Sequence, residues 1–268
     1  MKYRMLVAGL LMAFPAFSSW AQRAFTPDDL VKWERITRKS VSDDGRWVAV
    51  QFAPWQGDSR VEVYTAADGK QVFATAPAGK FDFASSSRYL VMEEVPSVSL
   101  TDSLKRRKVK ADKMPMNVLV IRDLQGRTSW KIDSLKSYRL AGKADWIAYQ
   151  QGRKDSVLYV ASLDGTQRVV LPNVSAYGFS PEGASLYFVT RDTSKGVRPG
   201  LYGWMSGQEK PRLLKEGKGV FNGCTFDKRG HRLAFLYAES KQKTDTASSL
   251  WLSTGMEKAG EAVTATTE

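Results

Sequence analysis

The sequence has few of the residues from which most catalytic and metal-binding sites are built. Its 268 residues include one cysteine, Cys224, and one histidine, His231. A single cysteine forms no intramolecular disulfide, and one cysteine with one histidine cannot make a His/Cys zinc cluster. A nucleophilic thiol would need a partnered histidine. We therefore expect Cys224 to be a buried inert thiol and His231 to be a strand-edge or solvated side chain.

Sequence motifs for other kinds of chemistry are missing as well. There is no phosphate-binding loop, no calcium-loop spacing and no Gly-x-Ser-x-Gly, since the run from Gly178 to Glu182 lacks the second glycine. A glycoside-acting enzyme would need two inward-facing carboxylates, and the available ones show no spacing that singles out a pair. These are Asp43, Asp44, Glu62 and Glu94. The sequence therefore predicts no catalytic, cofactor-binding or metal-binding residue, and no cofactor.

The only long apolar run lies at the N-terminus and is too short to span a bilayer. Met5 to Phe17 are 13 residues without charge, preceded by Lys2 and Arg4 and followed by Ser19-Trp20-Ala21. This pattern is typical of a secretory signal with a cleavage site after Ala21. We expect residues 1–21 to be removed and the mature protein to be exported, to the periplasm of a Gram-negative cell. A retained membrane anchor is the alternative; otherwise we expect no membrane contact.

The chain is basic, with a formal net charge of +12 that falls to about +10 without Lys2 and Arg4. Such a balance can indicate nucleic acid, an anionic membrane surface or an acidic substrate, and export argues against nucleic acid. Most of the charge is spread along the chain. One cluster runs from Lys105 to Lys108 and continues at Lys110 and Lys113. We expect it to lie on a solvated loop.

A turn followed by an apolar strand recurs five times. The first copy is Ser42 to Arg46 followed by Trp47 to Val50, and the five strands start at residues 47, 89, 146, 186 and 233. A second series of strand and glycine turn lies between them. Its turn glycines are Gly69, Gly126, Gly165, Gly207 and Gly255. Both series share one period of about 40–50 residues, which is the size of a four-stranded propeller blade.

The repeat predicts an all-β chain of about five four-stranded propeller blades, because sandwiches and barrels do not require this pattern to recur in phase. The expected blades are residues 41–80, 81–135, 136–175, 176–220 and 221–264. The second is longer by about fifteen residues, which indicates an insertion from Ser97 to Pro115. Residues 22–40 form a lead-in with a short helix beginning at Thr26. Beyond the last glycine turn, at Gly255, we expect no closing strand up to Glu268.

Two stretches resemble exported serine peptidases of the prolyl-oligopeptidase family, Bacteroidota type. The first is FTPDDLVKWERI at Phe25 to Ile36, leading into SVSDDGRWVAV at Ser40 to Val50. The second runs from the basic insertion through Met114 to Ile121, and on to Lys136–Arg139 and Trp146–Tyr149. The resemblance covers most of the mature chain. It implies a propeller of seven or eight blades that admits peptides to a following α/β-hydrolase domain.

The chain departs from that family because the nucleophile motif is missing, so no family catalytic residue is carried over. Glu93 and Glu94 are similar to the paired acids with which some aminodipeptidases of the wider family hold a substrate's amino end. We expect the N-terminal propeller part of such a peptidase, an incomplete arc that gates and scaffolds and is inactive alone. Its partners would be peptide in a full-length context, its own missing hydrolase domain or another exported protein. The alternative is a stand-alone periplasmic binding propeller similar to the Tol-associated ones.

Overall fold

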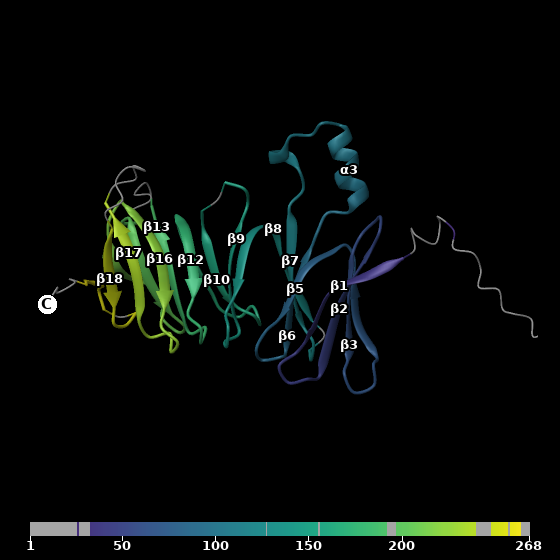
Figure 1. Ribbon diagram of the computed structural model, residues 1–268, viewed down its shortest axis with the longest axis horizontal. Coiled ribbons are helices and arrows are strands. Elements are labelled where there is room, and N and C mark those ends of the chain that lie inside the picture. The colour runs from purple at the N-terminus through teal and green to yellow at the C-terminus, as the bar shows by residue number, and fades with distance from the viewer. Residues whose placement is uncertain are drawn as a thin grey trace, which may run out of the picture. The chain divides into compact units, whose positions relative to one another are not determined.

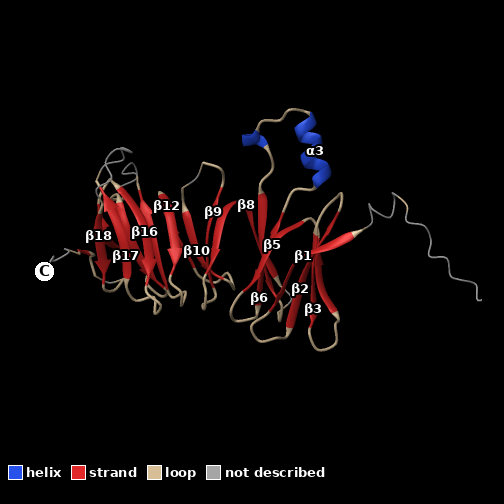
Figure 2. Cartoon of the chain, in the orientation of Figure 1, coloured by secondary structure: helices blue, strands red, loops and turns tan. Residues whose placement is uncertain are grey.

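The computed structural model describes residues 26, 33–126, 128–154, 156–191, 197–239, 248–256 and 258–263. The described residues from Glu34 onward belong to one compact unit. The signal sequence expected at residues 1–21 and the helix expected to begin at Thr26 lie outside the described residues, apart from Thr26 itself. Figure 2 shows that strands make up most of this part and that helix is confined to one insertion. No helix of the described part has the length and hydropathy needed to cross a bilayer.

The strands form antiparallel meanders that follow one another along the chain (Figure 1). The first sheet contains β1 (Glu34–Val41), β2 (Trp47–Pro54), β3 (Arg60–Thr65) and β4 (Gln71–Thr75). The second contains β5 (Ala78–Phe83), β6 (Tyr89–Glu94), β7 (Asn117–Asp123), β8 (Ser129–Leu140), β9 (Trp146–Gln151), β10 (Leu158–Ser162) and β11 (Arg168–Leu171). The third contains β12 (Val174–Phe179), β13 (Ser185–Thr190), β14 (Gly200–Met205) and β15 (Arg212–Glu216). The fourth contains β16 (Val220–Phe226), β17 (Leu233–Ala238), β18 (Ser249–Ser253) and β19 (Glu261–Ala262).

Strand β8 belongs to two successive meanders. Its first half pairs with β7 up to Leu135, and its second half, from Leu135 to Leu140, pairs with β9. Ser134 has a φ of 53°, which bends the strand between the halves. The described sheets therefore number four, and β8 joins the second and third repeats into seven strands. We number the meanders 1 to 5: β1–β4, β5 to early β8, late β8 to β11, β12–β15 and β16–β19.

This succession of four-stranded antiparallel meanders is the architecture of a β-propeller. The strand series expected from residues 47, 89, 146, 186 and 233 lies in the second strands β2, β6, β9, β13 and β17. The turns between first and second strands resemble one another in detail. Ser42 Oγ accepts from the Trp47 backbone N–H at 3.0 Å, Ser180 Oγ from Ser185 at 3.2 Å, and Asp227 Oδ1 from Arg232 at 3.1 Å. The repeated turn sequence thus stabilises a repeated turn.

Three expectations are corrected by the strands and the insertion. Residues 34–40, assigned to a lead-in, form most of β1, which pairs along β2. The basic insertion is not a loop but contains helix α3 (Val98–Arg106) and a 3-10 turn, η1 (Ala111–Lys113). Ser97 Oγ caps α3 by accepting from the Leu100 N–H at 3.3 Å. A further short strand, β19, follows the last glycine turn and pairs with β18.

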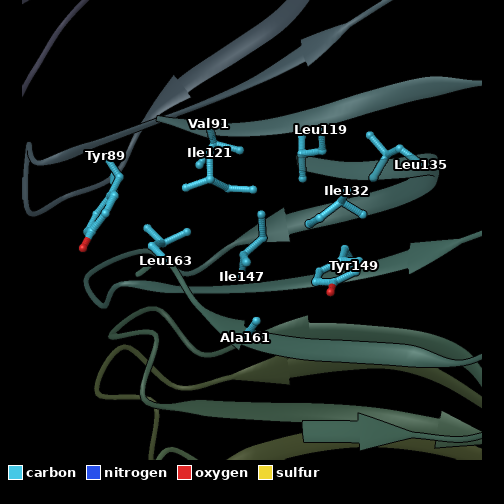
Figure 3. Packing of buried hydrophobic residues seen from close by; sticks show 11 residues of the cluster. Tyr89, Val91, Leu119, Ile121, Ile132, Leu135, Ile147, Tyr149, Ala161 and Leu163 are labelled. Atoms are coloured by element: carbon cyan, nitrogen blue, oxygen red, sulfur yellow. The ribbon is translucent and has the colours of Figure 1, made fainter. Parts of the chain in front are cut away.

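Buried side chains gather between consecutive meanders. Figure 3 shows the cluster between meanders 2 and 3, where Val91 and Ile121 from one side meet Ile147 and Leu163 from the other. Corresponding clusters lie between meanders 1 and 2, 3 and 4, and 4 and 5. Each buried aliphatic or aromatic side chain contributes about 1.5–3 kcal/mol. The stability of each meander therefore depends on its neighbours.

Candidate functional site: a polar groove along bulged first strands

The first strand of every meander carries the same irregularity. Its pairing with the second strand shifts register once, between residues 36 and 38, 78 and 81, 135 and 137, 174 and 176, and 222 and 225. A bulge inserts extra residues into one strand and turns their side chains away from the regular alternation. Several side chains at these bulges are exposed and do not pack in the core: Thr37, Lys80, Lys136 and Ser175.

Hydroxyl groups at two of these bulges bond back to the second strand. Thr37 Oγ1 donates to the Gln51 carbonyl at 3.4 Å, and Ser175 Oγ donates to the Val189 carbonyl at 3.2 Å. Gln51 and Val189 occupy the same place, four residues after the strand begins in β2 and in β13. These two bulges are therefore stabilised by side-chain hydrogen bonds.

At two junctions a glutamine clasps the next meander. Gln51 Nε2 donates to the Ala78 carbonyl at 3.1 Å, and Gln150 Nε2 donates to the Val174 carbonyl at 3.0 Å. The Oε1 atom of Gln51 accepts from Thr37 at 3.2 Å, and that of Gln150 accepts from Ser137 at 3.3 Å. Each carboxamide therefore connects the bulge of its own meander to the start of the next first strand. We call these contacts the glutamine clasps.

Meander 2 has a carboxylate at the corresponding place. Glu93, four residues after β6 begins, accepts a hydrogen bond from Asn117 Nδ2 at 2.7 Å. A carboxylate has no donor, so Glu93 cannot form a clasp with a carbonyl. At this junction a groove of about 720 Å³ lies between meanders 2, 3 and 4. Glu93 lines it, and neither clasp glutamine does.

The groove is polar and carries charges of both signs. Its cationic side chains are Lys80, Lys136 and Arg139, and its carboxylates are Asp82 and Glu93. Asp82 forms an ion pair with Arg38 of β1 at 2.5 Å. Lys80 and Lys136 lie within the bulged stretches of β5 and β8. The bulges therefore direct cations into the groove beside the strand that carries Glu93.

Tyr138, which also lines the groove, supplies a neutral donor. Burial raises the pKa of the Tyr138 phenol, the negative charges of Asp82 and Glu93 raise it further, and Arg38 lowers it. The phenol thus stays protonated at neutral pH and can donate a hydrogen bond. Its neighbour Ser137 lies 2.9 Å from the Tyr177 hydroxyl. The groove combines donors, acceptors and both charges, a set suited to a polar extended ligand such as a peptide.

The structure assigns structural contacts to most of the carboxylates considered in the sequence. Glu62 pairs with Arg60 at 2.6 Å, and Glu94 pairs with Lys131 at 2.7 Å. Asp44 accepts a hydrogen bond from Ser42 Oγ at 2.7 Å. Its pKa is lowered to about 2 by hydrogen bonds from the Arg46 backbone N–H, the Ser42 hydroxyl and the Arg46 guanidinium. Asp43 is exposed in the same turn. Of the pair Glu93–Glu94, which ends β6, only Glu93 lines the groove.

The two residues most often used as nucleophile and base lie away from the groove. Cys224 is half-buried on β16, and burial raises the pKa of its thiol to about 11. His231 is exposed in the turn before β17, where its backbone N–H donates to Asp227 Oδ1 at 2.7 Å. Ser180 lines the groove, but its Oγ is engaged by the Ser185 N–H. No cluster of three His, Cys, Asp or Glu residues suited to a metal ion occurs among the described residues.

The sequence pattern missed the residues that line the groove. Their strands contain glycine and charged residues, and bulges break their alternation, so they show no period of two. An alignment of the repeats with one another could have identified the position of Glu93. Aligning WVAVQ at 47–51 with WIAYQ at 146–150 and YLVME at 89–93 places the two glutamines and Glu93 in one column.

Comparison with known proteins shows remote structural likenesses. No family model matches the chain, and no curated protein sequence matches it. The propeller domain of the Trilobed protease from Pyrococcus furiosus is similar over 86% of this chain and 71% of that one, at 9% identity and a TM-score of 0.47. A prolyl endopeptidase structure is similar over 86% of this chain and 35% of that one, at 13% identity and a TM-score of 0.47.

A putative TolB from Agrobacterium tumefaciens is also similar, over 85% of this chain and 80% of that one. Its identity is 12% and its TM-score 0.41. The chain thus spans about a third of the prolyl endopeptidase and four fifths of the TolB protein. At these identities and TM-scores the likenesses assign no family and no activity to the chain.

Proposed function

We propose that this chain is the N-terminal propeller part of an exported prolyl-oligopeptidase-like serine peptidase, with a gating and scaffolding role. The observation that carries the proposal is the outward face of meander 5. On β17 the side chains of Leu233, Phe235 and Tyr237 are buried toward meander 4, and Leu236 points the other way and is 40% exposed. Leu236 pairs with Leu250 of β18, which is 45% exposed.

The corresponding face is covered in the earlier meanders. The third-strand residues that hold the place of Leu250 are fully buried, each in the cluster shared with the following meander: Val61, Leu119, Leu158 and Leu201. Leu236 lies four residues after Arg232, whose carbonyl closes the preceding turn, as Gln51 and Gln150 lie four residues after Trp47 and Trp146. Contiguous exposed apolar surface marks an interaction site or an aggregation liability. A further blade would cover this face in the way that each earlier meander is covered.

In this proposal the groove binds peptides transiently on their way to a hydrolase domain. Its mixed charges and the protonated Tyr138 phenol contact polar chain segments without cleaving them. A nucleophile, base and oxyanion site would come from the hydrolase domain. The purified chain should therefore bind peptides and show no hydrolysis of them.

A second candidate is a self-contained exported binding propeller, and the groove favours it. All of its lining residues come from meanders 2, 3 and 4 of this chain. Such a protein would need no further domain to bind a peptide or glycan. The two candidates differ in what they expect for the face of Leu236 and Leu250.

The test measures self-association of the purified chain by sedimentation velocity. The peptidase proposal expects concentration-dependent association, relieved by Leu236→Lys with Leu250→Lys. The matched control is Val170→Lys, at an exposed aliphatic residue of β11, which should leave association unchanged. A monomer that unfolds cooperatively and does not respond to the double substitution would favour the self-contained protein.

The DNA beyond codon 268 gives an independent answer. A frame that encodes Gly-x-Ser-x-Gly, followed by an aspartate and a histidine, supports the peptidase proposal. A terminator followed by an unrelated gene counts against it, and peptide hydrolysis by this chain alone would overturn it.

A further inference from the structure

The basic insertion is held in place at both of its ends. The Val98 N–H, at the start of α3, donates to Asp58 Oδ1 at 2.7 Å, and Asp58 lies in the loop between β2 and β3. At the other end, Arg153 Nη2 donates to the Met114 carbonyl at 2.5 Å. Arg153 follows β9. Loops of meanders 1 and 3 thus anchor an insertion that belongs to meander 2, and Figure 1 shows α3 beyond the ends of the strands.

Lys108 lies in the turn that ends helix α3, at a position where glycine is usual. Lys108 has a φ of 54°, and its N–H donates to the Lys105 carbonyl at 2.9 Å. The Val109 N–H closes the turn on the Leu104 carbonyl at 3.0 Å. Helices commonly end with a left-handed residue, and glycine takes that conformation without steric cost. The position therefore carries a positive charge at some expense in folding stability.

The insertion presents its cations to solvent. Six basic residues stand against two acidic ones between Val98 and Lys113. The basic residues, all exposed, are Lys105, Arg106, Arg107, Lys108, Lys110 and Lys113. Within the described part, one ion pair involves them, between Lys105 and Asp102 at 3.8 Å. We call these six residues the cationic insertion.

Exposed apolar side chains lie beside the same helix. Trp55, in the β2–β3 loop that also carries Asp58, is 76% exposed. Val98 and Leu100, in the first turn of α3, are exposed as well. The hydrogen bond from Val98 to Asp58 holds the helix start against this loop. The insertion carries the cations, and the loop that anchors its first turn carries the exposed indole.

We propose that the cationic insertion and Trp55 bind the chain peripherally to an anionic lipid surface. Clusters of four to eight Lys and Arg residues on a helix are attracted by anionic headgroups, and tryptophan is favoured at the level of those headgroups. An acidic protein would satisfy the cations but would need a pocket for the indole. The sequence predicted no membrane contact for the mature chain, and this proposal differs from that prediction.

The experiment measures co-sedimentation of the chain with vesicles of phosphatidylglycerol and phosphatidylcholine in equal parts. Vesicles of phosphatidylcholine alone serve as the comparison. We expect binding to the mixed vesicles only, and release at high salt, because salt screens exposed charges. Replacing Arg106, Arg107 and Lys108 by Gln should weaken binding about a hundredfold, since each cation near such a surface contributes roughly a factor of five. Trp55→Ser should weaken it by about tenfold.

The matched control replaces Lys228, Arg229 and Arg232 by Gln. These three residues are exposed cations at the turn before β17, and their replacement removes the same charge of three. The control should keep wild-type binding. Equal losses in both variants would show a general charge effect and overturn the assigned surface. No binding of the wild-type chain, or equal binding to both vesicles, would overturn the proposal. Thermal unfolding of each variant verifies that it is folded.

Lys108→Gly gives a test that folding damage cannot imitate. Glycine at this left-handed position should raise stability by a few tenths to about 1 kcal/mol while removing one cation. We expect a higher unfolding midpoint together with vesicle binding about fivefold weaker. A variant that is more stable and binds as well as the wild type would show that Lys108 does not contact the surface, and it would count against the proposal.

Discussion

The junction between meanders 1 and 2 and the junction between meanders 2 and 3 use the same position of the second strand in different ways. Gln51 reaches across to the Ala78 carbonyl, whereas Glu93 accepts from Asn117 of its own meander. Gln51 thus bonds across its junction, whereas Glu93 bonds within its own meander and lines the groove. In a repeated fold, therefore, a departure from the repeat is the best guide to where a ligand can bind.

The largest effect expected is at the other end of a clasped junction. Gly142, in the turn before β9, leaves no room for a side chain, because a Cβ there would lie 2.5 Å from the Pro181 carbonyl oxygen of meander 4. Gly142→Ala should lower the free energy of unfolding by about 3 kcal/mol, since the added methyl group would force the backbones of two turns apart. Gly255→Ala, where nothing lies within 4 Å, is the control. Equal stability of the two variants in chemical denaturation would contradict this packing.

The clasps themselves should differ in strength according to burial. Gln150 is 6% exposed, and Gln51 is half-buried. Methionine matches glutamine in length and cannot donate, so Gln150→Met leaves the Val174 carbonyl without that donor. We expect a loss of about 2 kcal/mol for Gln150→Met and about 1 kcal/mol for Gln51→Met. Denaturant midpoints measure both, and a larger loss at Gln51 would show that burial does not determine the strength.

The glutamine clasps contain no titratable group, so the loss of stability in acid should come from carboxylates at other positions. The Arg88 guanidinium, 2.7 Å from Asp123 Oδ2, and the N–H groups of Gly126 and Gln125 lower the pKa of Asp123 below its usual 3.8. A depressed pKa stabilises the fold above the unfolded value, and that stability is lost as pH falls through the folded value. The contribution of Asp123 to stability should thus be constant above about pH 5 and fall below it.

The same variants locate this acid response. Asp123→Asn should be less stable at neutral pH and should show a smaller fall in acid. Gln150→Met should keep the wild-type fall. Chemical denaturation at a series of pH values measures both. A fall of unchanged size in Asp123→Asn would place the acid response in other carboxylates, such as Asp44.

The smallest effect on stability is expected at Glu93, which replaces the glutamine found at the clasped junctions. Glu93→Gln restores the residue of the other junctions and keeps an oxygen for Asn117, so stability should change by less than about 1 kcal/mol. Its effect should fall on the groove. Calorimetric binding of a lysine-containing peptide should weaken in Glu93→Gln and stay unchanged in Glu94→Gln, whose carboxylate pairs with Lys131. Equal weakening in both variants would exclude Glu93 as the specific contact.

The sequence predicted the second and third strands well because they are apolar and follow repeated turns. WVAV at Trp47 and WIAY at Trp146 both lie in second strands of their meanders, β2 and β9. The first strands were not located, since β1 is the mixed sequence ERITRKSV and β16 contains Gly223 at a φ of 61°. The basic insertion was located by its length. Its helix was missed because charge alone does not distinguish a short helix from a loop.

The groove could not be predicted because it depends on which strands lie next to one another. Lys80 and Lys136 are 56 positions apart in the sequence. Bulges in β5 and β8 bring them to the same lining. No periodic pattern contains a bulge, so the lining residues follow only from the structure.

Hydrogen exchange of the purified chain tests most directly whether meander 5 has an open face. Strands β13 and β14 are covered by meanders 3 and 5, and β17 and β18 are covered by meander 4 on one side. The account predicts that amides of β17 and β18 open at a free energy lower by about 2 kcal/mol or more, the equivalent of one lost buried side chain. Equal protection of the two strand pairs would contradict it.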